Sequence, residues 1–358
     1  MILVVNAGSS SIKIALFDRD LSPVLSGAVS EIGGAGRITL GDVDRSLSVP
    51  DHGAALDALL GALADAGHPL NAVTAAGHRV VHGGATLTRP ERITPPTLDA
   101  IRACIPLAPL HNPHNLAGIE ALAASAPDLP QVACFDTAFH ATNPAVATTY
   151  ALPPDVTAEG YRRYGFHGIS YASLVEALPR ITGAPVPDRL LACHLGNGVS
   201  LCAIKANRSV ATTMGYSPLE GLTMGTRSGS IDANAVLALA AQHGIDVTTD
   251  LLNKRAGLLG LSGDTSDMRG LLASDDPAAR FAVDHFVYWA CRHAGSMIAA
   301  MEGLDAVAFT GGIGEHAAPI RDRIMQGLVW AGPVPHHVVP AAEERRIAAD
   351  TLQLLEAP

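Results

Sequence analysis

The stretch ILVVNAGSSSIKIALF, residues 2–17, consists of two apolar runs on either side of a loop of small residues. The runs at 2–5 and 12–17 have the length and composition of buried β-strands. Residues 6–11 between them are Asn, Ala, Gly and three Ser, so a ligand can approach the backbone closely there. The stretch therefore predicts a β-hairpin closed by a loop that suits a phosphate group.

The middle of the chain repeats this arrangement. Residues 190–195 and 199–204 are again strand-like runs, and Gly196-Asn197-Gly198 forms the turn between them. An internal repeat of a whole strand, turn and strand unit indicates duplicated domains.

Helix-like and strand-like segments alternate through the rest of the chain. We expect strands near 24–29, 37–49, 78–81, 131–135 and 306–309, and helices near 52–66, 115–125, 277–302 and 343–355. We also expect a loop at 310–315, followed by another helix. This order predicts an α/β protein whose final helix packs back on the first domain.

Composition limits the function classes. The chain has 358 residues, of which 48% are hydrophobic and 16% charged, so it is long enough for two folded domains and too apolar to be disordered. Its net charge of −10, without a cluster of Lys or Arg, argues against a nucleic-acid or membrane surface. We expect neither a signal peptide nor a membrane helix, because no apolar run approaches the ~20 residues that a membrane span needs. Five cysteines without C-x-x-C spacing predict reduced core thiols in the cytoplasm.

Three segments have the small residues that a phosphate-binding loop needs: 6–11, 196–198 and 310–314. Each alone is compatible with an ordinary turn, but three in one chain favour nucleotide binding. Gly312 to Ala317 also fits the G-x-G-x-x-A pattern of dinucleotide-binding folds, although too little chain follows to build such a domain. The absence of G-x-x-x-x-G-K-[ST] argues against a P-loop fold.

Two arginines stand among small and apolar residues rather than on a charged surface. Arg79 lies in GHRVVHGG (77–84) and Arg227 in MGTRSG (224–229). A planar guanidinium suits phosphate and carboxylate oxygens, while the structural alternative for each is a salt bridge.

A carboxylate and a histidine complete the candidate set. Asp136 follows the apolar run QVACF, and the carboxyl end of such a strand is where open α/β sheets bind ligands; the alternative is a helix cap or a turn residue. His167 has Gly165 and Gly168 close on either side, which suits a ring held against a ligand, although most histidines are structural.

At this point the sequence resembles the acetate kinases of the acetate and sugar kinase, heat-shock-70 and actin superfamily, over nearly its whole length. The matching stretches are VVNAGSSSIK (4–13), GHRVVHGG (77–84), PLAPLHNP (106–113), FDTAFH (135–140), RRYGFHGIS (162–170), CHLGNGVS (193–200), MGYSPLEGLTMGTRSGSID (214–232) and FTGGIGE (309–315).

The resemblance implies a role for particular residues. Around the transferring phosphoryl group it places Asn6, Arg79, Asp136, His167 and Arg227, with Ser9, Ser11 and Lys13 in the supporting first loop. For the acid it implies a pocket of Val81, Leu110, Phe166 and Pro218, with Arg79 binding the acid as well. For the nucleotide it implies Ser11, Lys13, His194, Leu195, Gly196, Asn197, Gly198, Asp267, Met268, Arg269, Gly312, Ile313, Gly314 and His316. For the metal it implies Asn6 and Glu343.

Some positions depart from the family pattern. Met268 stands where an aromatic residue is usual, His316 where Asn is usual, and Ala341-Ala342 where Thr-Asn is usual. The chain between Trp330 and Pro340 also looks shortened.

The resemblance implies two duplicated ribonuclease-H-like α/β domains flanking a nucleotide cleft, as in actin-like ATPases. We expect the first domain at 1–140 plus the C-terminal helix 343–358, and the second, nucleotide-binding domain at 141–342. The implied activity is reversible phosphoryl transfer between ATP and acetate, giving ADP and acetyl phosphate. The implied cofactor is Mg²⁺, with Mn²⁺ as a substitute, and the implied partners are a small carboxylic acid, an adenine nucleotide and a second copy in a homodimer.

The sequence leaves two alternative functions open. The first is a kinase for a longer acid such as propionate or butyrate, because the sequence does not set the depth of the pocket. The second is a catalytically silent nucleotide-binding protein on the same fold.

Overall fold

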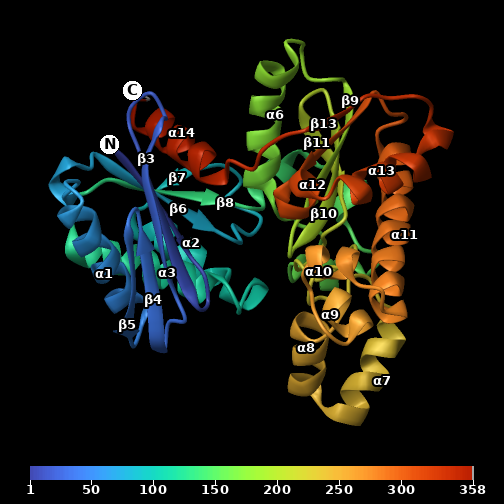
Figure 1. The fold of residues 1–358 in the computed structure, drawn as a ribbon, viewed down its shortest axis with the longest axis horizontal. Coiled ribbons are helices and arrows are strands. Elements are labelled where there is room, and N and C mark those ends of the chain that lie inside the picture. Colours follow the sequence, from blue (N-terminus) through green and yellow to red (C-terminus); the bar gives the residue numbers. More distant parts are fainter. Residues whose placement is uncertain (357–358) are drawn as a thin grey trace. The chain divides into compact units, whose positions relative to one another are not determined.

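The structure is a computed structural model that describes residues 1–356. Residue contacts divide the chain into two compact units. Unit 1 is Met1–Phe139 together with the chain from Ala342 onward, and unit 2 is His140–Ala341. The sequence predicts the corresponding boundaries at 140 and 342. Each unit contains one mixed β-sheet (Figure 1).

The sheet of unit 1 has eight strands in the order β5-β4-β3-β2-β1-β6-β8-β7. The strands are β1 (Ile2–Ala7), β2 (Ser11–Phe17), β3 (Pro23–Ser30), β4 (Gly34–Leu40), β5 (Val43–Val49), β6 (Ala75–Val80), β7 (Glu91–Arg92) and β8 (Gln131–Phe135). Strands β1 to β5 form an antiparallel meander, whereas β6 and β8 run parallel to β1. The hairpin predicted at the start of the chain is therefore confirmed.

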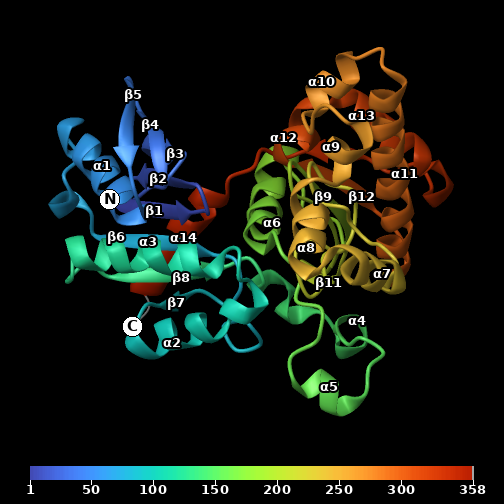
Figure 2. The same ribbon diagram turned by 90° about the horizontal axis from the view of Figure 1, so that it is seen from below.

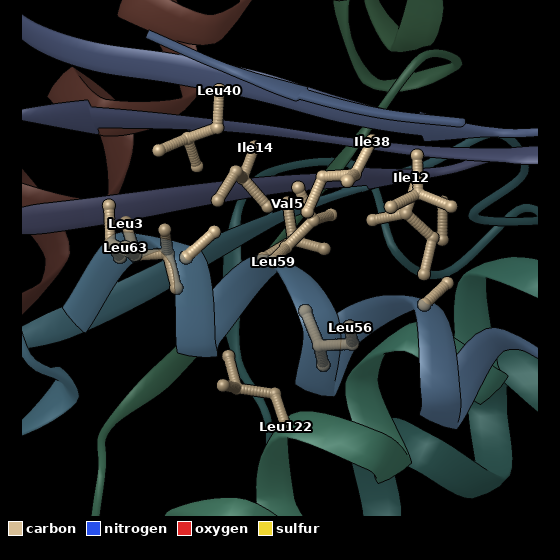
Figure 3. Packing of buried hydrophobic residues seen from close by; sticks show 14 of the residues in the cluster. Leu3, Val5, Ile12, Ile14, Ile38, Leu40, Leu56, Leu59, Leu63 and Leu122 are labelled. Atoms are coloured by element: carbon tan, nitrogen blue, oxygen red, sulfur yellow. The ribbon is translucent and has the colours of Figure 1, made fainter. Parts of the chain in front are cut away.

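Helices α1 (His52–Asp65) and α3 (Asn112–Ser125) cover one face of this sheet. Figure 3 shows Leu56, Leu59 and Leu63 of α1 and Leu122 of α3 packed against strand residues such as Val5. Asp51 begins α1 because its side chain accepts a hydrogen bond from the Ala54 N–H. Helix α2 (Pro95–Ala103) packs on α3 near a smaller apolar cluster.

The opposite face of β6 carries the C-terminal helix α14 (Glu343–Glu356). Alternate residues of a strand face opposite sides, so Ala76 joins the core under α1 while Gly77 faces α14. A β-carbon built on Gly77 would collide with Thr351 Oγ1 and would lie 2.6 Å from Ile347 Cγ2. The glycine therefore lets the helix lie directly on the strand.

The sheet of unit 2 has five strands in the order β11-β10-β9-β12-β13. They are β9 (Arg189–Leu195), β10 (Val199–Lys205), β11 (Arg208–Thr212), β12 (Ala306–Thr310) and β13 (His336–Val338). Strands β9 to β11 are antiparallel, and β12 and β13 run parallel to β9. Unit 1 has the same order in β3-β2-β1-β6-β8, so the repeat seen in the sequence is present in both sheets.

Helices α6 (Gly168–Thr182) and α11 (Pro277–Ala300) lie on opposite faces of this second sheet (Figures 1 and 2). The other helices of unit 2 are α4 (Ala145–Thr148), α5 (Pro154–Ala158), α7 (Ala233–His243), α8 (Ile245–Lys254), α9 (Gly257–Ser262), α10 (Met268–Ala273), α12 (Gly311–His316) and α13 (Ala318–Gly327). Antiparallel β10 and β11 also exclude the parallel sheet that a dinucleotide-binding domain would require.

The expected loop at 310–315 is wrong, because helix α12 begins at Gly311. Three glycines in six residues predict a loop, yet here they allow close packing. Gly311 has φ +78°, and a side chain there would lie 2.8 Å from the Leu195 carbonyl oxygen. Tertiary packing thus overrides the low helix propensity of glycine.

Cys104, Cys134, Cys193 and Cys202 are buried free thiols, and Cys291 is a half-buried one. Burial raises the pKa of all five, which agrees with an inert role in the core. Within residues 1–356, none of the helices is both long and apolar enough to cross a bilayer.

Candidate active site

Arg79 and Asp136 form an ion pair at the carboxyl ends of two neighbouring strands in unit 1. Strands β6 and β8 pair with Arg79 opposite Cys134, and the Asp136 N–H donates to the Val80 carbonyl. Arg79 Nη2 then lies 2.6 Å from Asp136 Oδ2, with Arg79 Nε 3.2 Å from both carboxylate oxygens. The Asp136 side chain is only 2% exposed, whereas that of Arg79 is 23% exposed. The cation therefore keeps one side open while its anion is buried.

Glu343 joins this pair because α14 lies on β6. Burial acts to lower the pKa of Arg79, but the negative charges of Asp136 and Glu343 raise it on balance, so the guanidinium stays charged. Burial also raises the pKa of Glu343, Arg79 opposes that effect, and Asp136 and Glu344 add to it. Two carboxylates thus stand near a single arginine.

The first loop of unit 1 is held by its own backbone and by one side chain of α1. Gly8 N–H donates to the Ser11 carbonyl, and Gly8 O lies 2.7 Å from His52 Nε2. Asn6 and Lys13 face each other across the β1–β2 hairpin. Ser9 is exposed and Ser11 half-buried. The loop is held at its base and keeps exposed hydroxyls at its tip.

Two asparagines of α3, Asn112 and Asn115, hold the segment after β6 against the start of α3. Val81 belongs to the first of these segments, and Leu110 lies just before the second. The Val81 N–H donates to Asn115 Oδ1 at 3.0 Å, and the His82 N–H donates to Asn112 Oδ1 at 3.1 Å. Val81 is half-buried, and Leu110, two residues before α3 begins, is 46% exposed. The segment that carries Leu110 is therefore fixed beside Val81, with the leucine side chain at the surface.

His167 of unit 2 has an unusual backbone conformation directly before α6. Its φ of 57° and ψ of 23° lie in the left-handed region, which non-glycine residues rarely adopt. Gly165 before it has φ +79°, and a side chain there would lie 2.6 Å from His140 Cδ2 and Thr212 Cγ2. Phe166 between them is fully buried. Such conformations are common in turns and are also found at functional sites, so this one makes His167 a candidate.

The His167 ring stacks on the His194 ring, with centroids 4.0 Å apart and planes 24° from parallel. His167 Nδ1 lies 2.9 Å from Ser200 Oγ, and His194 Nδ1 lies 2.8 Å from Ser170 Oγ. Each histidine is therefore oriented by a serine hydroxyl. Both serines are buried.

Gly198 and Arg227 lie next to the His167 ring. A β-carbon built on Gly198 would lie 3.1 Å from His167 Nε2 and 3.8 Å from Arg227 Nη1. Arg227 Nη1 also lies 3.4 Å from the Pro218 carbonyl oxygen. The structure thus brings together the histidine, the arginine, the glycine turn and Pro218 that the sequence singles out separately.

The segment that carries Arg227 is held by backbone contacts. The Gly225 N–H donates to the Asn197 carbonyl at 2.9 Å, and a side chain on Gly225 would collide with Asn197 Oδ1. Gly257 has φ +64°, and a side chain at this position would collide with the Met224 carbonyl. These glycines fix the arginine segment on the Gly196–Gly198 turn.

The remaining nucleotide candidates lie on two short helices. In the β9–β12 pairing Thr310 faces His194, so Gly311 at the start of α12 lies beside Leu195. Gly312 is exposed, Ile313 half-buried and Gly314 buried, and His316 ends the helix exposed to solvent. At α10, Asp267 caps the helix and pairs with Arg269 at 2.7 Å, and both side chains are exposed, while Met268 is buried.

Sequence reasoning missed Ser170, Tyr171 and Ser200 as site residues. Ser200 stands in β10 between apolar residues that are all buried. A hydroxyl buried in such a strand needs a hydrogen-bond partner, and that requirement is the signal that identifies it.

The chain matches the model of the acetokinase family over residues 1–342. It is 46% identical over 347 residues to the acetate kinase of Rhodopseudomonas palustris, covering 93% of this chain and 87% of that protein. It is 43% identical over 389 residues to the acetate kinase of Nitrobacter hamburgensis, covering 99% and 96%.

Solved structures give the same result. The chain is similar to Porphyromonas gingivalis acetate kinase, with a TM-score of 0.92 and 34% identity over 99% of each chain. It is also similar to a propionate kinase from Francisella tularensis, with a TM-score of 0.94 and 35% identity over 98% of this chain and 99% of that one.

Two sheets of equivalent strand order and this set of residues define an ATP-dependent phosphotransferase of the actin-like ATPase fold. Within that class the chain belongs to the acetokinase family.

Proposed function

We propose that the chain transfers the terminal phosphoryl group of ATP to acetate, reversibly, giving acetyl phosphate and ADP. Family membership supports this reaction. The observation that carries it is the cluster of His167, Gly198 and Arg227 in unit 2, where a donor and a cation meet at a glycine turn. Such a cluster is suited to an anionic phosphoryl group.

Acetate needs no general base. Carboxyl groups of this kind have pKa values near ~4, so the nucleophile is already ionised at neutral pH. The difficulty is instead that two anions must approach each other. Arg79 and Arg227 neutralise charge on the reacting oxygens, and His167 donates a hydrogen bond to the phosphoryl group. The transfer is a direct in-line displacement.

Asn6, Asp136 and Glu343 are the residues that would hold Mg²⁺, or Mn²⁺ in its place. Mg²⁺ in kinases is held by one or two carboxylates together with substrate phosphates and waters. Unit 1 fits that description, because burial and the negative charge of Asp136 raise the pKa of Glu343, and a bound cation would oppose both effects. Residues 1–356 contain no cluster of three or more His, Cys, Asp or Glu side chains able to hold a metal by themselves. When bound, the ion would neutralise charge on the ATP phosphates.

For the nucleotide, we propose that Ser11 and Lys13 support the phosphates from the first loop. His194 to Gly198 contact them from the turn of unit 2. Asp267, Met268, Arg269, Gly312, Ile313, Gly314 and His316 contact the adenosine.

The test is trapping of the acyl phosphate with hydroxylamine. Purified protein, ATP, Mg²⁺ and acetate should give acetohydroxamate, and omission of any one of them should abolish the product. A silent nucleotide-binding protein would bind ATP and give no hydroxamate, which would overturn the proposal.

A kinase for propionate is the second candidate, because a propionate kinase is among the similar structures. Val81, Leu110, Phe166 and Pro218 are the proposed walls of the acid pocket. We propose acetate as the substrate because the curated relatives are acetate kinases. Steady-state rates across acetate, propionate and butyrate decide between the two.

We further propose a homodimer in the cytoplasm. The outer face of α11 presents Phe281 and Tyr288, which are 57% and 63% exposed and lie two turns apart. These two exposed aromatic side chains support the proposal, because aromatic residues are enriched in surfaces that another chain covers. Light scattering after gel filtration should give twice the monomer mass, and Tyr288→Glu should lower it.

A further inference from the structure

The loop of residues 215–220 carries Pro218, one of the two proposed pocket walls that belong to unit 2. The other is Phe166. The Pro218 carbonyl oxygen accepts a hydrogen bond from Arg227 Nη1 at 3.4 Å. Residues 216–220 are all half-buried and belong to no helix or strand. The position of Pro218 therefore depends on the contacts that hold this loop.

One hydroxyl closes the loop. Tyr150 Oη accepts a hydrogen bond from the Tyr216 N–H at 3.0 Å and donates its own proton to Glu220 Oε2 at 2.5 Å. Both directions are fixed, because a backbone N–H only donates and a carboxylate oxygen only accepts. Burial raises the pKa of Tyr150, the bond to Glu220 raises it further, and the bond from the Tyr216 backbone lowers it, as these directions require. Residues 216 and 220 are thus joined through Tyr150.

Gly215 lets the hydroxyl and the carboxylate come close to the loop backbone. A β-carbon built on Gly215 would collide with Glu220 Oε2 and would lie 2.5 Å from Tyr150 Oη. Arg163 completes the cluster. Its guanidinium lies over the Tyr150 ring, 4.3 Å from the centroid, and its Nη2 lies 3.4 Å from Glu220 Oε1. Each oxygen of the Glu220 carboxylate therefore has a partner.

The same loop is attached to the segment that carries Phe166. The Gly215 carbonyl accepts from the Tyr164 N–H at 3.0 Å and from the Gly165 N–H at 3.3 Å. Phe166 follows directly in the chain and is fully buried. One network of hydrogen bonds thus holds the chain next to both proposed walls.

We propose that Tyr150 and Glu220 are positioning residues that set the length of the acid by holding Pro218 in place relative to Phe166. The inference rests on the proposed function, in which these two side chains line the acid pocket. Without the bridge the loop loses attachments at both ends, so Pro218 moves outward and a longer acid gains room. One methylene in an apolar pocket changes kcat/KM by roughly 10- to 200-fold, so a small movement of the wall is measurable.

The ratio of kcat/KM for propionate to that for acetate measures this effect, because a general loss of stability or rate cancels in it. Tyr150→Phe keeps the ring that Arg163 covers and removes only the hydroxyl, so the ratio should rise about tenfold. Glu220→Ala should raise it by a similar factor. Glu220→Gln should raise it less, because the amide oxygen still accepts from Tyr150.

Tyr164→Phe is the matched control. It also removes one tyrosine hydroxyl, but this hydroxyl donates to the Gly160 carbonyl at 3.0 Å and not to the loop. The backbone N–H of residue 164 keeps its bond to Gly215. The ratio should therefore stay at the parent value.

Hydrogen exchange of the Tyr216 amide measures the bridge without any substrate. In ¹⁵N-labelled protein this amide should exchange at least about tenfold faster in Tyr150→Phe than in the parent, because its acceptor is lost. In Tyr164→Phe it should exchange at the parent rate.

An unchanged ratio in folded Tyr150→Phe and Glu220→Ala, or an equal rise in Tyr164→Phe, would overturn the inference. Failure of Tyr150→Phe and both Glu220 variants to fold would do the same, because the network would then support the fold and not the pocket. An active parent with an unchanged ratio in the variants would refute the inference and leave the proposed function intact. A parent that forms no hydroxamate with any acid would refute both, while the Tyr216 amide would still show whether the bridge forms.

Discussion

At the scale of single residues, the candidate site contains carboxylates that are buried, where a charge costs free energy. Asp136 is almost completely buried, and Glu343 is partly buried beside it, with Arg79 as their shared cation. A buried charge is tolerated only where the surrounding protein or a bound ligand compensates for its lost hydration. Two predictions separate these cases.

The first prediction concerns Glu343, whose pKa burial raises above the ordinary value of 4.5. In the window above that value the folded protein holds a proton that the unfolded chain has lost, so stability falls as pH rises through it. Without metal at pH 7, Glu343→Gln should therefore raise the free energy of unfolding by roughly 1 kcal/mol, a typical single-site effect. The gain should vanish near pH 4, where the parent side chain is protonated in both states.

Thermal unfolding in chelator at both pH values measures this difference. Glu356→Gln, an exposed position on the same helix, is the control and should change nothing. A destabilised Glu343→Gln at pH 7 would mean that the positive charges of Arg79 and Lys13 already satisfy the ionised carboxylate.

The second prediction concerns Asp136. Asp136→Asn should lower kcat by at least about 100-fold, because a neutral amide cannot help to hold Mg²⁺, while the amide oxygen still accepts from Arg79 and keeps the fold. Asp305→Asn is a matched control, since Asp305 also pairs with an arginine, Arg189, where strands β9 and β12 begin. The control should lose stability but not activity. Equal activity in both variants would remove Asp136 from the mechanism.

At the scale of elements, α14 connects the end of the chain to the candidate site. The helix lies on β6 because Gly77 has no side chain, and this contact brings Glu343 toward Arg79. The absence of a side chain at Gly77 therefore decides how closely α14 packs on the strand.

The third prediction tests that contact. Gly77→Ala would place a β-carbon against Thr351 and Ile347, so it should destabilise the protein by about 1–3 kcal/mol, as overpacking does, and should lower kcat as Glu343 shifts. Gly61→Ala in α1 meets nothing within 4 Å and should stabilise by about 0.5–1 kcal/mol. Denaturant unfolding of both variants gives the comparison. If Gly77→Ala is as harmless as Gly61→Ala, α14 does not depend on this contact.

The elements also show where sequence reasoning works. Helix α1 was predictable because leucines at helical spacing follow a capping Asp51. Helix α12 was not, because its glycines indicate a loop and only the contact with Leu195 explains the helix. The short strand β13 has two histidines in three residues, and its strand conformation comes from pairing with β12.

At the scale of the whole molecule, duplication is the property that the sequence reveals best. The strand, glycine turn and strand units near residues 2–17 and 190–204 become β1–β2 and β9–β10, each with parallel strands beside it. Motifs also predicted that Arg79, Asp136, His167 and Arg227 matter. They did not predict that Tyr171 and Ser200 stand behind His167, because no local pattern joins a helix residue to a strand residue 29 positions later.

The role of Arg227 in phosphoryl transfer is tested by comparing Arg227→Ala with Arg255→Ala, which alters an exposed arginine of the same unit that pairs with Asp250. Rates are measured in both directions, from ATP with acetate and from acetyl phosphate with ADP. We expect that Arg227→Ala loses about 100- to 1,000-fold in kcat in each direction with little change in unfolding temperature, while Arg255→Ala keeps the parent rate. Near-normal turnover by folded Arg227→Ala protein would contradict the claim that this arginine stabilises the transferring phosphoryl group.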